Sequence, residues 1–136
     1  MKYKFLEHTA DVMFQAFGKS LNEVFENSAV AMFEVMVDIK KVALVKAVKI
    51  KCSAENDEEL LIEWLNNLLA EAGTHEMVFS KFKVKITDGK LAGKAFGEKL
   101  NEKKHDIKTE VKAATYSGLF IKKQGRKFIG QVVVDV

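Results

Sequence analysis

The stretch NDEELLIEWLNNLLAEAG, residues 56–73, decides the fold class of this 136-residue chain. Its apolar residues recur at positions i, i+1, i+4 and i+5, which is the spacing of one buried face of an α-helix. Asn56 or Asp57 can cap the amino-terminal end, and Gly73 suits the carboxyl-terminal end. We therefore predict a core helix that ends near Gly73.

A second amphipathic helix is predicted upstream. Ser20 of the segment SLNE can cap its first turn, while Glu23 can reach back to the Ser20 amide. Apolar residues continue at helical spacing to about residue 36, at Leu21, Val24, Phe25, Met32, Val35 and Met36.

The remaining segments alternate with the two-residue period of strands. From Thr9 onward, one face of the predicted strand carries Ala10, Val12, Phe14 and Ala16, and Asp11 lies on the opposite face. Residues 42–52 and 81–87 also alternate, and Asp88–Gly89 predicts a hairpin turn. Two or more strands are expected after residue 106. We predict an α+β fold with a mainly antiparallel sheet, in a single domain over residues 1–136.

Composition narrows the class of protein. No apolar run approaches the roughly 20 residues of a membrane helix, and the amino terminus lacks the pattern of a signal peptide, so we expect a cytoplasmic protein with no membrane partner. The formal net charge is +3 and Arg126 is the only arginine. Base-specific nucleic-acid readers rely on arginine, so this class is disfavoured. Cys52 is the only cysteine and favours a buried apolar role.

Motifs of common enzymes are missing. The chain has no glycine-rich phosphate loop between a strand and a helix and no serine elbow, and its histidines, His8, His75 and His105, lack the spacing of a helical zinc pair. We expect His75 in a polar loop after the second helix and His8 in a structural role.

The carboxyl terminus, VVVDV, brings the Asp135 side chain and the α-carboxylate of Val136 to the end of a predicted strand. Two carboxylates about 4 Å apart repel by roughly 4 kcal/mol at an effective dielectric constant near 20. Protonation, a lysine or a divalent cation can offset this repulsion. If Asp11 joined them, the oxygen ligands would suit Ca2+ or Mg2+. Solvated acids at strand ends are the simpler alternative.

Lys112 is the remaining candidate. In IKTEVKAATY, residues 107–116, alternation places Lys112 on the same face as Glu110. This arrangement fits either an exposed ion pair of small energetic value or an ammonium group positioned to meet a phosphate or a partner's acid.

Several motifs together resemble the archease family over essentially the whole chain. They are HTADV (8–12), GKSLNEVFENSAVAMFEVM (18–36), ELLIEWLNNLLAE (59–71), FGE (96–98), KHD (104–106), EVKAATY (110–116) and VVVDV (132–136).

The resemblance implies a small non-catalytic partner of the GTP-dependent RNA ligase that joins tRNA exon halves with 3′-phosphate ends. It implies that the protein promotes guanylylation of the ligase, allows multiple turnover and can widen the nucleotides accepted. It also implies a metal site at Asp11, Asp135 and Val136, with Ca2+ the expected cation and Mg2+ or Mn2+ as alternatives. The resemblance further implies that Lys112, Asp11 and Asp135 take part in activating the ligase.

Three other functions are considered. One is a chaperone-like modulator of a tRNA methyltransferase. Another is a small metal-dependent enzyme that recruits His8 or His105. The third is an RNA-binding module, with Phe79 or Phe82 available for stacking on bases and with a lysine surface made of Lys81, Lys83, Lys85, Lys90 and Lys94. Because Phe82 shares the apolar face of its strand, we expect direct binding of tRNA to be weak or absent.

Overall fold

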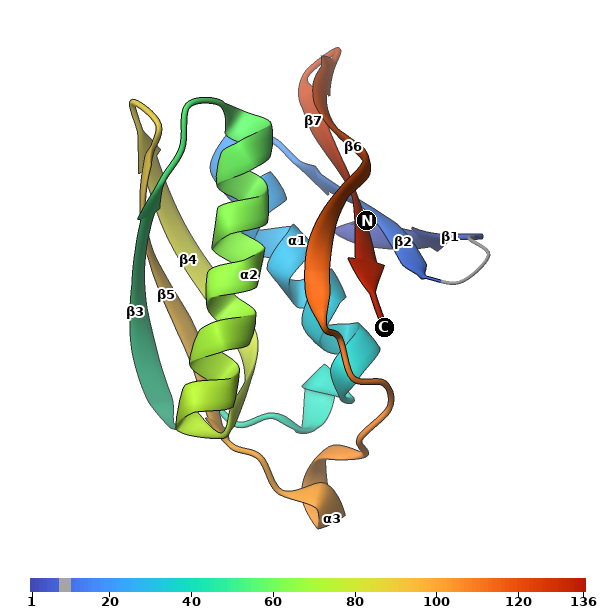
Figure 1. Ribbon diagram of the computed structural model, residues 1–136, viewed down its shortest axis with the longest axis vertical. Helices are drawn as coiled ribbons and strands as arrows, with labels where there is room; N and C mark the ends of the chain where they lie inside the picture. The colour runs from blue at the N-terminus through green and yellow to red at the C-terminus, as the bar shows by residue number, and fades with distance from the viewer. Residues whose placement is uncertain (8–10) are drawn as a thin grey trace.

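The computed structural model describes residues 1–7 and 11–136 and has two antiparallel sheets with helices between them (Figure 1). The strand orders are β1-β2-β7-β6 and β3-β5-β4. The α+β class and the antiparallel pairing are therefore confirmed. The elements are β1 (Tyr3–Leu6), β2 (Val12–Gly18), α1 (Leu21–Met36), the 3-10 turn η1 (Ile39–Lys41), β3 (Lys46–Ser53), α2 (Asp57–His75), β4 (Met77–Thr87), β5 (Lys90–Lys99), α3 (Glu102–His105), β6 (Ala113–Gln124) and β7 (Lys127–Asp135).

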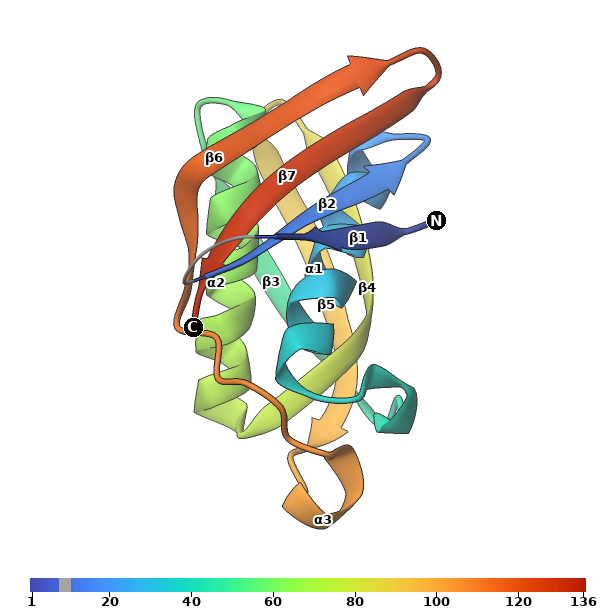
Figure 2. The same cartoon turned by 90° about the vertical axis from the view of Figure 1, so that its right-hand side faces the viewer.

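Both long helices lie in the middle layer, with one sheet on each side (Figures 1 and 2). The apolar face of α2 supplies much of the core, and Trp64 is fully buried at its centre. The Trp64 indole N–H donates a hydrogen bond to the Phe25 carbonyl of α1, 3.0 Å away. This bond satisfies the polar group of a buried side chain and joins the two helices. No helix in the described residues is long and apolar enough to cross a membrane.

The predicted helix starts are confirmed. Ser20 Oγ accepts a hydrogen bond from the Glu23 amide at 3.2 Å, and Asn56 Oδ1 accepts one from the Glu59 amide at 2.9 Å. The end of α2 differs from the prediction, because the helix passes Gly73 and ends at His75. His75 therefore lies in the helix and not in a loop, and its ring contacts Glu71 one turn earlier.

Two predicted strands begin later than expected. The segment from residue 42 becomes a strand only at Lys46, and Leu44, in the irregular segment between η1 and β3, is 54% exposed. The alternation predicted for residues 107–113 is also wrong, since β6 begins at Ala113 and both Val111 and Ala114 are buried. The polar connection before β6 contains the short helix α3.

Strand β7 pairs with β2, so two strands from opposite ends of the sequence lie side by side (Figure 2). Val12 is paired with Val134 and Phe14 with Val132, and these side chains belong to the core. The predicted face of Val12, Phe14 and Ala16 is thus confirmed. His8, Thr9 and Ala10 lie outside the described residues.

Candidate functional site

The candidate site lies at one end of the four-stranded sheet and is set by strand register. Val12 of β2 is paired with Val134 of β7, and Asp11 and Asp135 are the next residues beyond this pair. Asp135 is the last residue of β7, and side-chain alternation puts its carboxylate on the face turned away from the helices. Asp11 lies in the bend just before β2. Val136 follows, and its half-buried side chain packs against the core. We call Asp11, Asp135 and the Val136 α-carboxylate the acidic end.

Lys112 adjoins the acidic end from the position just before β6, the strand next to β7. Its backbone N–H donates to the Asp135 carbonyl at 2.8 Å, and the following residue, Ala113, is paired with Asp135. The Lys112 side chain is exposed, as is Glu110. Figure 2 shows the carboxyl terminus beside the start of β6. The register therefore brings all four residues singled out in the sequence to one end of the sheet.

The sheet surface next to the acidic end is apolar and covered. Met13 and Val133 form the next outward-facing pair, and Val133 is fully buried. The cover comes from β6, whose register shifts between Thr115 and Phe120. Within this bulge, the Gly118 carbonyl accepts a hydrogen bond from Gln131 Nε2 at 2.8 Å. The two aspartates are half-buried against this surface, which weakens the screening of their charges.

The donor set at the acidic end fits a hard divalent cation. Two carboxylates brought within about 5 Å of each other repel by about 3 kcal/mol at an effective dielectric constant near 20, and a divalent cation bound between them offsets this repulsion. Within the described part of the chain, no lysine, arginine or histidine lies within 4.0 Å of the Asp11 or Asp135 carboxylate. Oxygen-only ligands suit Ca2+, Mg2+ or Mn2+ rather than zinc.

Within residues 1–7 and 11–136, no three His, Cys, Asp or Glu side chains gather to hold an ion, at the acidic end or elsewhere. The acidic end has only two such side chains. The other carboxylate of the acidic end is the α-carboxylate of Val136, which belongs to the backbone and not to a side chain.

Asn66 fixes the start of β6, and sequence reasoning did not single it out. Its side chain accepts a hydrogen bond from the Ala114 N–H at 2.8 Å and donates one to the Ala114 carbonyl at 3.1 Å. Helix α2 thus holds the strand two residues after Lys112. In the sequence, this role is indicated only by an amide side chain at the border of the apolar stripe of a core helix.

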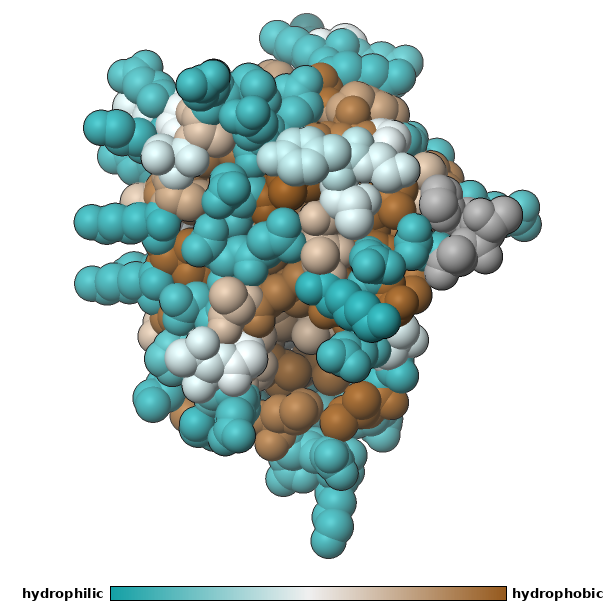
Figure 3. Space-filling view, in the orientation of Figure 1, coloured by the Kyte–Doolittle hydropathy of each residue, from teal (hydrophilic) through white to brown (hydrophobic). Residues whose placement is uncertain are grey.

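A groove of about 1090 Å³ runs beside Lys112, between α2 and the segment before β6. Leu69, Gly73, Met36 and Val111 line its apolar part, and Glu110 and Lys112 line its rim. The space-filling view shows this hollow with hydrophobic residues on its floor (Figure 3). Lys112 therefore stands between the acidic end and a concave apolar surface.

His105 and Glu98 form a second polar cluster, at the far end of β5. His105 is fully buried, and its Nδ1 accepts a hydrogen bond from the Asn101 amide at 2.9 Å. Its Nε2 must then carry the proton and donate to Glu98 Oε2, 2.8 Å away. Hydrogen bonds from the Ala43 amide, His105 and Lys104 lower the pKa of Glu98 to about 2. Both ring nitrogens of His105 are engaged, so this histidine ties α3 to the sheet.

Cys52 is a poor nucleophile in this fold. Burial raises the pKa of its thiol to about 11, and the nearby Glu63 carboxylate adds to the effect. The thiol is therefore protonated at neutral pH, whereas a reactive cysteine needs the thiolate. This agrees with the predicted apolar role.

Comparison with known proteins identifies the family. A model of the Archease protein family (MTH1598/TM1083) matches residues 3–136. The protein archease of Sulfurisphaera tokodaii is 44% identical over 137 residues, which is 99% of both chains. The chain belongs to the archease family. The archease of Methanosarcina barkeri is 41% identical over 140 residues, covering 99% of this chain and 96% of the relative.

Solved structures give the same result for the archease fold. A solution structure of Methanobacterium thermoautotrophicum protein 1598 is 39% identical, has a TM-score of 0.88 and covers 99% of each chain. A crystal structure of an archease from Thermotoga maritima, described as a possible chaperone, has a TM-score of 0.67. It is 22% identical and covers 98% of this chain and 96% of its own, so it supports the fold alone. The family resemblance predicted from the motifs is confirmed.

Proposed function

We propose that this archease is a non-catalytic activator of the GTP-dependent tRNA-splicing RNA ligase. It promotes transfer of GMP to a ligase histidine, allows multiple turnover and widens the nucleotides that the ligase accepts. Membership of the family supports the proposal. The structural observation that carries it is the convergence of Asp11, Asp135, Val136 and Lys112 at one end of the four-stranded sheet.

The acidic end is the part of the molecule that meets the ligase. Asp11, Asp135 and the Val136 carboxylate hold a divalent cation, with Ca2+ as the expected ion. A bound cation supplies positive charge where nucleotide phosphates must be neutralised. Phosphoryl transfer depends mainly on positioning and charge neutralisation, so a protein can accelerate it without a nucleophile of its own.

Lys112 orients the contact between this protein and the ligase. Its backbone is fixed by Asp135 and, through the next two residues, by Asn66. Its exposed ammonium group is then free to reach a phosphate or a carboxylate of the partner. The groove beside it gives the ligase a shaped surface next to the charged groups.

Single-turnover transfer of GMP to the cognate ligase tests this proposal. The parent protein should accelerate the transfer, and Asp11→Asn and Asp135→Asn should lose most of the acceleration while staying folded. Asp88→Asn is the matched control, because Asp88 lies in the β4–β5 turn with a φ of 50°, a conformation that asparagine tolerates. If folded Asp11→Asn and Asp135→Asn proteins accelerated GMP transfer as well as the parent does, the acidic end would have no part in the mechanism. If the parent protein did not accelerate the transfer, the proposal would be wrong.

The terminal carboxylate has its own test. One glycine added after Val136 moves this group away from Asp135, and we expect Ca2+ affinity to fall about tenfold, which corresponds to about 1.4 kcal/mol. Isothermal titration of the protein without ligase measures it, and a glycine added before Met1 is the control. Equal affinities in the two extended proteins would exclude the α-carboxylate as a ligand.

A second candidate function is chaperone-like modulation of a tRNA methyltransferase. Exposed apolar side chains favour it: Leu44 is 54% exposed, Val45 70% and Leu100 43%, and Val45 and Leu100 line one shallow pocket. Light scattering of the methyltransferase with and without this protein distinguishes suppression of aggregation from ligase activation.

A further inference from the structure

The outward face of the three-stranded sheet is a grid of lysines. Register places Lys49, Lys94 and Lys83 in one row across β3, β5 and β4. In the next row, Lys51 and Lys85 flank Ala92. The lysine face has seven members, all exposed: Lys49, Lys51, Lys81, Lys83, Lys85, Lys90 and Lys94. Five of them were visible as a lysine surface in the sequence, and strand pairing adds the two from β3.

The charge on this face is one-sided. Seven of the 22 basic side chains lie on it, and Glu98 is the one acidic side chain at an outward position of these three strands, so the rest of the chain carries 15 basic and 18 acidic side chains. Glu98 is the next outward position on β5 beyond Phe96, and it is already bonded to Lys104 and His105. Like charges opposite each other destabilise a sheet. The face therefore holds a repulsive arrangement that an external polyanion relieves.

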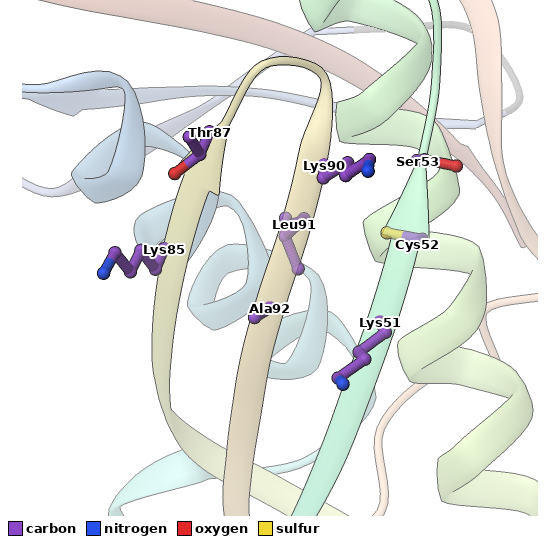
Figure 4. Close-up of a pocket in the computed structure, with 8 residues that line it drawn as sticks. All are labelled: Lys51, Cys52, Ser53, Lys85, Thr87, Lys90, Leu91 and Ala92. Carbon is purple, nitrogen blue, oxygen red and sulfur yellow. The ribbon is translucent and has the colours of Figure 1, made fainter.

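The centre of the lysine face is a shallow depression. Ala92 has a small side chain, and hollows of about 500 and 320 Å³ adjoin it and share Lys51 and Lys85. Figure 4 shows Lys51, Lys85 and Lys90 on three different strands around Ala92 and Leu91. Lysine side chains thus surround a shallow floor without blocking it.

We propose that the lysine face binds the phosphate backbone of double-helical RNA. Lysines about 5 Å apart across strands and about 7 Å apart along them can each meet a different phosphate of one backbone. A flat sheet has no element that enters a groove, whereas RNA helices are recognised largely by shape and by backbone contacts. The interaction does not require the ligase and is independent of the acidic end.

The face has the chemistry of a reader of phosphates and not of bases. Phe79 and Phe82, the residues considered for stacking, are 0% and 4% exposed in the core. Phe96 is half-buried at the edge of the face. Lysine is a point charge without the planar geometry that recognises a base edge. Binding is therefore independent of the RNA sequence.

Large exposed apolar side chains such as Val45, Ile107 and Tyr116 lie on other segments, so the lysine face lacks groups that insert into a membrane.

Fluorescence anisotropy with a labelled RNA hairpin, across a salt series and without ligase, tests the proposal. If about four lysines contact phosphates, affinity should fall about 100-fold between 50 and 200 mM salt. Such binding is weak at physiological salt, which agrees with the expectation from the sequence that direct binding of tRNA is weak or absent. The triple variant Lys49→Gln, Lys83→Gln, Lys94→Gln should bind at least about tenfold more weakly at 50 mM salt, with a salt slope lower by about 2.

A charge-matched control separates the face from net charge. Lys2→Gln, Lys40→Gln and Lys103→Gln remove three exposed lysines elsewhere, and this protein should bind within about twofold of the parent. Equal losses in the two triple variants would overturn the proposal, as would no binding of the parent at 50 mM salt. Tighter binding to a DNA duplex of the same sequence, or to vesicles rich in anionic lipid, would also overturn it. Circular dichroism establishes that both variants are folded.

Discussion

The two sheets pack their inner faces against the same pair of helices, yet their outer faces differ in chemistry. The outer face of the three-stranded sheet carries seven lysines in a regular grid. The outer face of the four-stranded sheet is largely apolar beside Met13 and Val133, and it ends in two aspartates and the chain terminus. The inner faces account for the fold, and the outer faces hold the groups available to partners.

The tolerance of the two sheets to an added methyl group gives the largest expected contrast. A Cβ at Gly97 of β5 would lie 1.8 Å from the Val78 carbonyl oxygen, a backbone atom, whereas one at Gly130 of β7 would lie 2.8 Å from a Val24 side-chain carbon. Backbone cannot move aside as a side chain can. Gly97→Ala should lower the free energy of unfolding by about 3 kcal/mol and Gly130→Ala by about 1 kcal/mol. Denaturant titration of both variants measures this, and equal losses would mean that the sheets are equally adaptable.

The attachment of the four-stranded sheet to the shared helix is a smaller effect. Asn66→Ala removes both hydrogen bonds to Ala114 and should lower the free energy of unfolding by about 2 kcal/mol. Asn67→Ala is the matched control, because the Asn67 side chain bonds only to the Glu63 carbonyl of its own helix, and it should change stability by under about 0.5 kcal/mol. Hydrogen exchange at the Ala114 amide should accelerate in the first variant only. Unchanged exchange there would show that β6 does not need this contact.

The smallest of these effects concerns Glu98, which ties α3 to the three-stranded sheet. Its pKa of about 2 in the folded protein lies below the ordinary value near 4.5. The ionised carboxylate therefore contributes stability that is fully present above about pH 4.5 and is lost as the pH falls toward 2. Glu98→Gln should flatten this part of the stability profile, measured by denaturant titration from pH 2.5 to 7. Glu102→Gln, which removes an exposed acid of α3, should leave the slope unchanged, and a parent slope in Glu98→Gln would assign the acid sensitivity to other groups.

Local patterns predicted the helices and the hairpin for a physical reason. Ser20 and Asn56 cap helices with hydrogen bonds that span three residues, and the Asp88–Gly89 turn needs only its own positive φ angles of 50° and 72°. The later start of β3 and β6 was not predictable in this way. Leu44 and Val111 are both apolar, but one is exposed and the other buried because of segments distant in sequence. Alternation cannot distinguish a strand from an irregular segment that packs its apolar residues by chance at the same spacing.

The sequence by itself determined which residues carry charge and which face of each regular element they occupy, because side-chain direction follows from backbone period. It named Asp11, Asp135, Val136 and Lys112, and it identified the family through its motifs. Only the tertiary structure decided which of these faces meet. Pairing of β2 with β7 joins residues 110 to 122 positions apart, and pairing of β3 with β5 completes the lysine face. Both arrangements depend on the shared core of α1 and α2, because the two sheets pack on opposite sides of these helices.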